Sequence, residues 1–264
     1  MPSATQVCVV GALGRMGQAV RASLAREPGM RFAAALEAPG HPRLGEPLEA
    51  GVALGDDPKA ALARCDVVID FSTPASTLRV LDAAATREVP CVVGTTGFTR
   101  PERDRIAELG RHLAIVLAPN FSVAVCVLTY LAREAARGLG PGYDAEILEL
   151  HHRSKRDAPS GTAQRLAEAV AEGRGEAVRE ALVLTRAGET GPRPPGAIGV
   201  QALRGGDNPG EHTVFFLGDG ERLELSHRAA TREHFVQGAL RAARWVLGRE
   251  PGLYAMEDVL GLRP

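Results

Sequence analysis

Short apolar runs, each followed by a loop of small residues and then by a helix-like segment, repeat through the first half of the chain. The first run, residues 6–10, is continuous rather than alternating, which is typical of a parallel strand buried on both faces. Further runs of this kind are predicted at 31–36, 67–71, 90–93 and 113–117. Strands that alternate with helices in this way form a parallel, doubly wound sheet, and ligands bind where its strands end.

The loop after the first run carries Gly11, Gly14 and Gly17 and leads into a helix predicted at 18–26. The spacing G-x-x-G-x-x-G departs from the strict dinucleotide fingerprint, and a tight turn alone would explain isolated glycines. The context favours a cofactor, because the second strand ends at Glu37, 20 residues beyond Gly17. A carboxylate at this place binds the adenosine ribose of a dinucleotide. A solvated glutamate at a strand end is the alternative.

The regular alternation stops after a helix predicted at 123–136 and a segment rich in Gly and Pro at 138–142. One further helix is predicted at 162–172. Strand-like runs lie at 145–150, 181–185, 198–203, 211–217 and 221–227. With little helix between the later runs, this half is expected to be a smaller α+β domain with an open, mixed sheet.

An amphipathic helix predicted at 233–247 would return the chain to the first domain. We therefore expect a dinucleotide-binding domain formed by residues 1–122 and 231–264. Residues 123–230 would form a substrate-binding and oligomerisation domain. An open sheet needs a cover, and a second copy of the chain is the natural one, in a dimer or a tetramer.

The segment at residues 149–163, ELHHRSKRDAPSGTA, concentrates the ionisable side chains of the second domain at the end of a predicted strand. By the two-residue alternation of a strand, Glu149 and His151 share one face, while Leu148 and Leu150 share the other. The leucines are expected to face the core. His151 would then project from the working side.

The same segment continues through a Pro-Ser-Gly-Thr turn into a helix that is expected to begin at about Thr162. The free N–H groups of Ser160, Gly161 and Thr162, with the positive end of the helix dipole, would hold a carboxylate or a phosphate. Lys155 lies between the histidines and this turn. The arrangement indicates a site that grips an anion and offers it a proton. A structural histidine pair beside a solvated charge cluster is the alternative.

Overall charge and hydropathy exclude several classes of partner. The formal net charge is −1, which argues against a nucleic-acid or anionic-membrane surface. Apolar residues make up 45% and charged residues 24% of the chain, as in soluble globular proteins. The start lacks the basic region of a signal peptide, and charges interrupt the longest apolar stretch, at 123–136. We expect a cytoplasmic protein that binds neither nucleic acid nor membrane.

The four cysteines, Cys8, Cys65, Cys91 and Cys126, are widely spaced in apolar segments and form no C-x-x-C pair. This pattern is typical of small core residues in a reducing cytosol. Neither a disulfide framework nor a bound metal is expected.

Six motifs extend this interpretation. They are VVGALGRMG, DFSTP, VGTTGF, APNFSV, HHRSKRDAPSGTA and IGVQALRGGDNPGEHTV. With the C-terminal helix, they closely resemble the bacterial 4-hydroxy-tetrahydrodipicolinate reductase family, also called dihydrodipicolinate reductases. The resemblance covers essentially the whole chain, in order and at family spacing. The histidine–lysine segment is highly specific to the family, whereas the glycine loop is not.

The resemblance implies a nicotinamide-binding domain joined to a domain for substrate binding and tetramerisation. It thereby implies a homotetrameric enzyme. It implies that 4-hydroxy-tetrahydrodipicolinate, a small cyclic dicarboxylate, loses water and is reduced by NAD(P)H to tetrahydrodipicolinate in diaminopimelate and lysine biosynthesis. A dicarboxylate explains an anion-binding turn with cationic surroundings, and the intermediate formed by hydride addition must take up a proton.

The resemblance also implies roles for individual residues. Lys155 is the proton donor, and His151 is a proton donor or acceptor. The residues placed on the substrate are His152, Gly161 and Thr162, and the anion-binding turn adds Ser160. Those placed on the cofactor are Gly11, Ala12, Leu13, Gly14, Arg15, Met16, Glu37, Gly94, Thr95, Thr96, Ala118, Pro119, Asn120 and Phe121.

One position departs from family members that favour NADPH. They often carry a basic residue directly after the acidic ribose contact, and here that residue is Ala38. Glu37 would then repel a 2′-phosphate, so NADH is expected to be the preferred cofactor. His41 and Arg43 lie nearby, which leaves NADPH open.

Two other functions share part of this pattern. Another two-domain NAD(P)-dependent amino-acid dehydrogenase would share the first half but would not need HHRSKRDAPSGT. A non-catalytic NADH-binding module would not need an intact histidine–lysine segment either. That segment favours the reductase over both.

Overall fold

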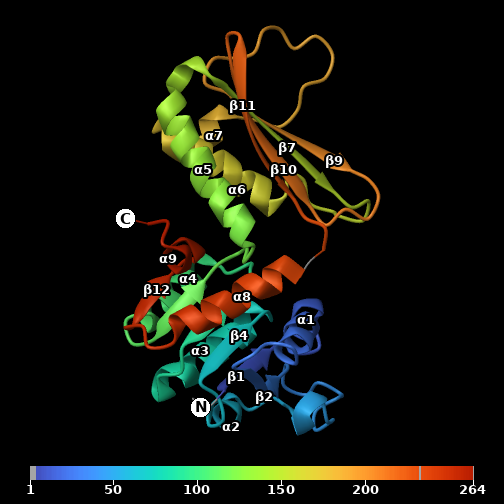
Figure 1. Cartoon of the computed structure of the whole chain (residues 1–264), viewed down its shortest axis with the longest axis vertical. Helices are drawn as coiled ribbons and strands as arrows, with labels where there is room; N and C mark the ends of the chain where they lie inside the picture. The colour runs from blue at the N-terminus through green and yellow to red at the C-terminus, as the bar shows by residue number, and fades with distance from the viewer. Residues whose placement is uncertain (1–3, 232, 264) are drawn as a thin grey trace. The chain divides into compact units, whose positions relative to one another are not determined.

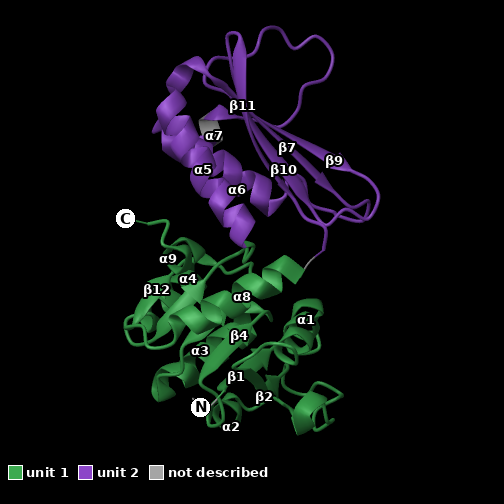
Figure 2. Ribbon diagram, in the orientation of Figure 1, with its two compact units in different colours: residues 1–122, 233–264 green, residues 123–232 purple. Residues whose placement is uncertain are grey.

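The computed structural model describes residues 4–231 and 233–263. The chain divides into two compact units, shown in different colours in Figure 2. Unit 1 comprises residues 1–122 and 233–264, and unit 2 comprises residues 123–232. Among the helices of the described residues, none combines the length and hydrophobicity needed to cross a membrane.

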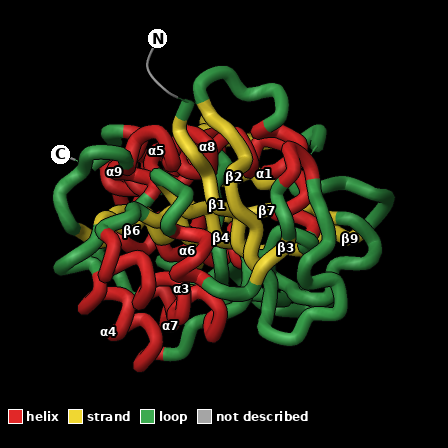
Figure 3. The backbone as a smooth tube through the Cα atoms, turned by 90° about the horizontal axis from the view of Figure 1, so that it is seen from below, coloured by secondary structure: helices red, strands yellow, loops and turns green. Residues whose placement is uncertain are grey.

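Unit 1 is built on a parallel sheet of seven strands in the order β12-β6-β5-β4-β1-β2-β3. Its strands β1, β2 and β4 are labelled in Figures 1 and 3. Its strands are β1 (Thr5–Val10), β2 (Met30–Leu36), β3 (Leu54–Gly55), β4 (Val67–Asp70), β5 (Cys91–Val93), β6 (Ala114–Leu117) and β12 (Gly252–Tyr254). Its helices are α1 (Arg15–Leu24), η1 (Glu49–Gly51), α2 (Pro58–Leu62), α3 (Pro74–Arg87), α4 (Arg100–Leu109), α8 (Glu233–Val246) and α9 (Met256–Leu260).

Helices cover both faces of this sheet. Leu62 of α2, Leu81 of α3 and Ile106 of α4 share one apolar core with strands β1, β4, β5 and β6. Helices α1 and α8 contact each other, and α8 lies against β4, β5 and β6. The Rossmann-like, doubly wound fold predicted from the sequence is therefore confirmed.

Local chemistry explains where the helices of unit 1 begin. Thr73 caps α3 by accepting a hydrogen bond from the Ser76 N–H, and Pro74 occupies the first turn, where its missing N–H costs nothing. Thr99 and Glu102 form a reciprocal capping box at the start of α4. The strands β3 and β12 and the helix α9 were not predicted.

The cysteines belong to the packing of the molecule. None of the four forms a disulfide; Cys8 and Cys91 are buried and Cys65 and Cys126 are half-buried. Burial raises the pKa of the Cys91 thiol well above its ordinary value. The expected core location is confirmed for Cys8 and Cys91 and holds in part for the other two.

Unit 2 contains a mixed sheet of five strands in the order β11-β10-β7-β9-β8. Pairs β7–β9 and β8–β9 are parallel, whereas β10 pairs antiparallel with both β7 and β11. The strands are β7 (Asp144–His151), β8 (Leu182–Val183), β9 (Ile198–Arg204), β10 (Glu211–Gly218) and β11 (Glu221–Arg228). The helices are α5 (Val123–Leu139), η2 (Gly140–Gly142), α6 (Gly161–Arg174) and α7 (Val178–Ala181). The smaller mixed-sheet domain is confirmed, although the strand expected at 181–185 shrinks to β8.

Helices α5 and α6 lie along one side of this sheet (Figure 1). The prediction for the two faces of β7 is wrong, because Ile147, Glu149 and His151 are buried on the helix side. Leu148 and Leu150 are only half-buried on the opposite side. Both faces carry apolar residues, so the alternation separates two sides without telling which one the helices cover.

The opposite side, here called the open face, is the face of Leu148, Leu150, Leu203, Phe215 and Leu217. The strand register places these residues on one face, since Leu150 pairs with Leu203 of β9, and Phe215 and Leu217 pair with Glu146 and Asp144 of β7. Leu203 and Leu217 are exposed, with 49% and 37% of their surface accessible. Charged residues such as Glu146 and Glu211 lie between them on the same face. Exposed leucines in such a mixed surface are compatible with a protein–protein interface.

Candidate functional site

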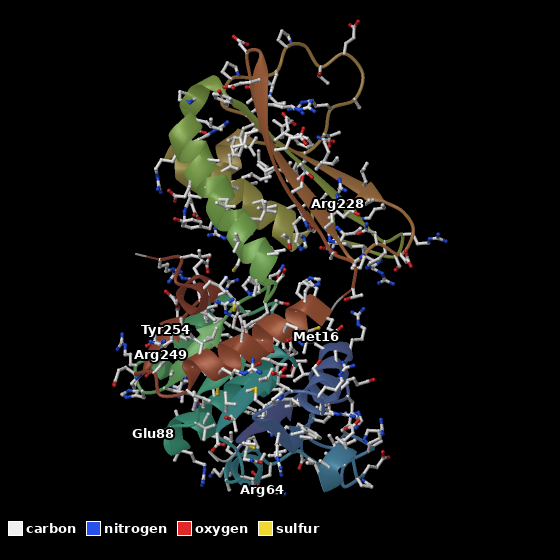
Figure 4. The ribbon with its side chains drawn as sticks, in the orientation of Figure 1. Met16, Arg64, Glu88, Arg228, Arg249 and Tyr254 are labelled. Atoms are coloured by element: carbon white, nitrogen blue, oxygen red, sulfur yellow. The ribbon has the colours of Figure 1, made fainter. Side chains whose placement is uncertain are left out.

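The glycine loop of unit 1 lies where β1 ends, and close backbone contacts explain its glycines. Gly11 has φ +70°, and a Cβ there would meet the Phe71 carbonyl oxygen at 2.7 Å. A Cβ at Gly17 would lie 2.1 Å from the Gly11 carbonyl oxygen. Met16, labelled in Figure 4, lies in the first turn of α1, which contains no acidic residue. This helix N-terminus is able to hold a pyrophosphate.

Glu37 stands at the end of β2, beside this loop. Its Oε1 accepts a hydrogen bond of 2.8 Å from the Leu13 N–H, so the carboxylate is fixed against the loop that carries the glycines. Ala38 is exposed. Arg43 forms an ion pair of 2.7 Å with Glu46 and does not pair with Glu37 among the contacts of the described residues.

A buried carboxyl that sequence reasoning missed, Asp70, links the loops after β4 and β5. Its Oδ1 accepts from the Ser72 N–H at 2.9 Å and from the Thr95 hydroxyl at 3.3 Å. Burial raises the pKa of Asp70, although the hydrogen bond from Ser72 opposes the effect. The available signal was its place as the first residue of the DFSTP motif, directly after an apolar run. Thr95, expected on the cofactor, turns its side chain into this network and is buried.

An aromatic ring of the loop after β4, Phe71, packs against the loops after β5 and β6. A Cβ at Gly94 would lie 2.0 Å from the ring of Phe71, which shows how closely that ring covers the backbone. Phe71 meets Phe121 edge to face, with ring centroids 5.7 Å apart. Phe121 and Ala118 are buried, whereas Thr96 is exposed, and the Asn120 Oδ1 accepts from the Ser122 N–H at 2.8 Å. The residues predicted to bind the cofactor thus lie together at one edge of the sheet, and part of the surface that they offer there is backbone.

In unit 2, the end of β7 holds a glutamate–histidine pair. The Glu149 carboxylate is completely buried, and its Oε2 is hydrogen-bonded to Nδ1 of His151. Its Oε1 accepts from the Ser160 N–H at 3.0 Å and from the Arg204 guanidinium at 2.9 Å. Arg204 also donates to the Asp157 carbonyl oxygen at 2.8 Å.

Burial alone would raise the pKa of Glu149. The hydrogen bonds from His151, Arg204 and the Ser160 N–H outweigh that effect and lower the pKa to about 2. Glu149 is therefore an anion at neutral pH.

The amino terminus of α6 lies beside this pair. Ser160 caps the helix, because its hydroxyl accepts from the Ala163 N–H at 3.2 Å. The same hydroxyl lies 3.3 Å from Nε2 of His212. Gly161 and Thr162 form the first turn, which contains no acidic residue. A helix of 14 residues that begins here can hold a carboxylate at its positive end.

Lys155 follows the histidines in a tight turn, with its N–H donating to the His152 carbonyl oxygen at 3.1 Å. Its Nζ donates to both carboxylate oxygens of Asp157 at 2.9 Å. This ion pair lowers the pKa of Asp157, chiefly through the hydrogen bond from Lys155. The His152 ring accepts or donates a 2.8 Å hydrogen bond with the Ser154 hydroxyl.

His212 of β10 is a second residue that the sequence did not single out. Its ring lies edge to face with His151, with centroids 5.2 Å apart. Burial lowers the pKa of His212 to about 3, and the nearby His151 adds to the effect. A histidine on a predicted strand, in a family motif, was the available signal.

Donor atoms of Glu149, His151 and His212 lie within 4.8 Å of one another, as metal ligands would. Both Glu149 oxygens already accept hydrogen bonds, and one of them is paired with the Arg204 guanidinium. A neighbouring cation and an occupied carboxylate favour a proton-transfer network over a divalent cation site.

The class of protein follows from the sheet of unit 1 and from the ionisable network of unit 2: a two-unit oxidoreductase with a Rossmann-like, NAD(P)H-binding unit. The model of the family "Dihydrodipicolinate reductase, N-terminus" matches residues 5–121, and that of "Dihydrodipicolinate reductase, C-terminus" matches residues 124–260. The chain belongs to the dihydrodipicolinate reductase family.

Individual relatives agree with this assignment. The 4-hydroxy-tetrahydrodipicolinate reductase of Anaeromyxobacter dehalogenans is 51% identical over 268 residues, covering 98% of each chain. That of Geobacter sulfurreducens is 48% identical over 266 residues, covering 98% of this chain and 100% of the relative. A dipicolinate-bound dihydrodipicolinate reductase from a Paenisporosarcina species has a TM-score of 0.80 at 25% identity, covering 97% of this chain and 99% of that one.

Proposed function

We propose that this chain reduces 4-hydroxy-tetrahydrodipicolinate, after loss of water, to tetrahydrodipicolinate with NAD(P)H, in diaminopimelate and lysine biosynthesis. The observation that carries the proposal is the network at the end of β7, found in a chain about half identical to reductases of that name over nearly its full length. A relative bound to dipicolinate, an aromatic dicarboxylate, supports an anionic ring as the ligand. Four cysteines without a disulfide are compatible with a reducing cytoplasm, where we place the enzyme.

In the proposed site, His152, Gly161 and Thr162 hold the substrate carboxylates. Ser160, expected from the sequence to offer its N–H as well, already donates that N–H to Glu149 and is buried, so it orients the start of α6 instead. The N–H groups at the start of α6 and the helix dipole favour an anion there. Lys155 approaches the ring as an ammonium, which stabilises negative charge as it develops and gives up a proton.

The proposed cofactor site uses the edge of unit 1 described above. When bound, NAD(P)H supplies the hydride. The loop from Gly11 to Met16 would hold the pyrophosphate, and Glu37 would accept hydrogen bonds from the ribose. Residues at positions 94–96 and 118–121 would line the nicotinamide, largely through backbone.

A coupled assay tests the function. Aspartate semialdehyde, pyruvate and the condensing synthase generate the substrate in place, and loss of NADH or NADPH is followed by absorbance. Turnover that requires all three additions is the expected result. NADH that binds but is never oxidised in this mixture would contradict the proposal and indicate a binding module.

Cofactor choice is proposed to favour NADH. The 2′-phosphate of NADPH would place negative charge beside Glu37, and Ala38 supplies no cation. Like charges about 4 Å apart repel by roughly 4 kcal/mol at an effective dielectric near 20. Exposure and salt reduce this to about 1–2 kcal/mol, so kcat/KM for NADH is expected to be about 5- to 30-fold higher.

Ala38→Arg is expected to move the preference towards NADPH, because a guanidinium pairs well with phosphate. Ala38→Gln is the matched control, since it adds length without charge and should leave the preference in place. Steady-state kcat/KM for both cofactors gives the comparison. A wild-type enzyme with a clearly higher kcat/KM for NADPH would refute the Glu37 argument. His41 or Arg43 would then be the partner of the 2′-phosphate.

We further propose that copies of the chain associate through unit 2 as a homotetramer. The open face carries the exposed leucines Leu203 and Leu217 among charged residues, and an interface would remove these leucines from water. Light scattering at micromolar concentration is expected to give the mass of four chains. Leu203→Glu, which puts a charge on the open face, is expected to yield smaller species.

Leu253→Glu is the matched control, because Leu253 is similarly exposed but lies on β12 of unit 1. It should leave the mass unchanged. A wild-type monomer would refute the association, and an unchanged mass for Leu203→Glu would refute the open face as its surface.

A further inference from the structure

We propose that Glu149 is a positioning residue: it holds the His151 ring with the proton on Nδ1, so that Nε2 is the atom that exchanges a proton at the substrate. This inference deepens the proposed function and rests on it. It assigns the task to a buried strand residue that does not itself touch the substrate.

The Glu149 carboxylate is held from both sides. Its Oε1 receives two donors, the Ser160 N–H at 3.0 Å and the Arg204 guanidinium at 2.9 Å. Its Oε2 is left for Nδ1 of His151. Because the carboxylate is buried and ionised, with a pKa of about 2, it can only accept, and Nδ1 must donate.

The opposite edge of the ring is kept clear by Gly210. A Cβ at this residue would lie 2.9 Å from Nε2 of His151 and 3.3 Å from its Cδ2. Gly210 has φ +147°, a conformation that other residues rarely adopt. The Gly210 N–H is fixed by the Asn208 side chain at 2.8 Å. The ring is thus anchored at Nδ1, and the space beside Nε2 is free of any side chain from Gly210.

The neighbouring charges suit such a task. An imidazolium formed on His151 would face the Glu149 anion, whereas the adjacent His212 stays neutral because burial lowers its pKa to about 3. A carboxylate that orients a histidine and stabilises its charged form is a known arrangement in acid–base catalysis. Arg204 and the Ser160 N–H fix the carboxylate in turn.

Glu149→Gln makes the inference testable, because its amide has one acceptor and one donor end. Two donors meet at Oε1, so the amide oxygen is expected to stay there and the NH₂ to turn towards His151. Nδ1 would then have to accept, and the proton would move to Nε2. We expect kcat to fall by about 100-fold or more, with the Kd of NADH unchanged.

Long-range ¹⁵N NMR spectra report the tautomer directly, measured where the ring is neutral and assigned by comparison with His151→Gln. The wild type is expected to show Nδ1–H and Glu149→Gln to show Nε2–H. Glu146→Gln is the matched control: Glu146 lies on the same strand and pairs with Arg186 and Arg193, but on the other face. It should keep both tautomer and kcat.

The outcomes separate the two proposals. A wild type that shows Nε2–H, or a folded Glu149→Gln with kcat near that of the wild type, overturns the positioning role even when the enzyme reduces its substrate. A wild type without turnover overturns the proposed function instead. Should Glu149→Gln fail to fold, the wild-type spectrum alone still decides which nitrogen carries the proton.

Discussion

Lys155→Ala is expected to lower kcat by about 100- to 10,000-fold, the range found when a general acid is removed. The Kd of NADH, measured by fluorescence, should barely change, because the proposed cofactor residues belong to unit 1 and Lys155 belongs to unit 2. The reason lies in the position of Lys155, between His151 and the start of α6.

The ion pair of Lys155 with Asp157 does not oppose this role. Lys155 is only 19% exposed, but the Asp157 side chain is 62% exposed. Exposed pairs contribute at most about 1 kcal/mol, so a substrate carboxylate can compete for the ammonium. The ion pair keeps the ammonium near the site without trapping it there.

The chain offers a close control, because Lys59 is its only other lysine. Lys59 is exposed on α2 of unit 1, and its part in the helix cap uses backbone, so Lys59→Ala should keep wild-type kinetics. A Lys155→Ala enzyme within a few-fold of wild-type kcat would exclude Lys155 as the proton donor. In that case His151 would be the remaining candidate.

Most of unit 1 could be predicted because buried parallel strands leave a strong local signal. Runs such as the one that becomes β5 are apolar throughout and are followed by a small residue, here Gly94. The strand β3 has two residues and β12 has three. Segments this short acquire their conformation from neighbouring strands, which a local pattern cannot represent.

The network of unit 2 was predicted only in part for a different reason. His151, Lys155 and the capped turn are neighbours in the sequence, so their association could be inferred. Arg204 and His212 reach the same place from strands more than 50 residues away, through the pairing of β9 and β10 with β7. Without knowledge of that register, the sequence alone could not distinguish Glu149 from other residues of the strand.

Acid is expected to destabilise the protein through His212. Its pKa falls from 6.5 to about 3 on folding, chiefly because burial disfavours the charged ring. The unfolded chain therefore binds a proton that the folded one rejects. Above about pH 6.5 this group does not change the free energy of unfolding. As pH falls from 6.5 towards 3, the free energy of unfolding decreases. The difference of about 3.5 units between the unfolded and folded pKa of His212 corresponds to a total loss of roughly 5 kcal/mol.

Glu149 adds to this dependence at lower pH. Its pKa is depressed from 4.5 to about 2, so its stabilising contribution is present above 4.5 and is lost as pH falls through 2. Between about pH 6 and pH 4, the slope from His212 alone should approach 1.4 kcal/mol per pH unit. Denaturant titrations followed by circular dichroism across this range measure the slope.

His212→Asn removes the titrating ring and keeps a polar side chain near the Ser160 hydroxyl. Because the ring is gone, the slope of unfolding free energy against pH is expected to fall by the equivalent of about one proton. The variant is expected to be less stable than the wild type at neutral pH, because it leaves a cavity, and to close that gap in acid. His112→Gln serves as the control, since His112 is exposed in unit 1. If the stability curves of His212→Asn and the wild type run parallel between about pH 6 and pH 4, the buried His212 ring does not reject the proton. The conclusion that His212 is a neutral neighbour of His151 would then be wrong.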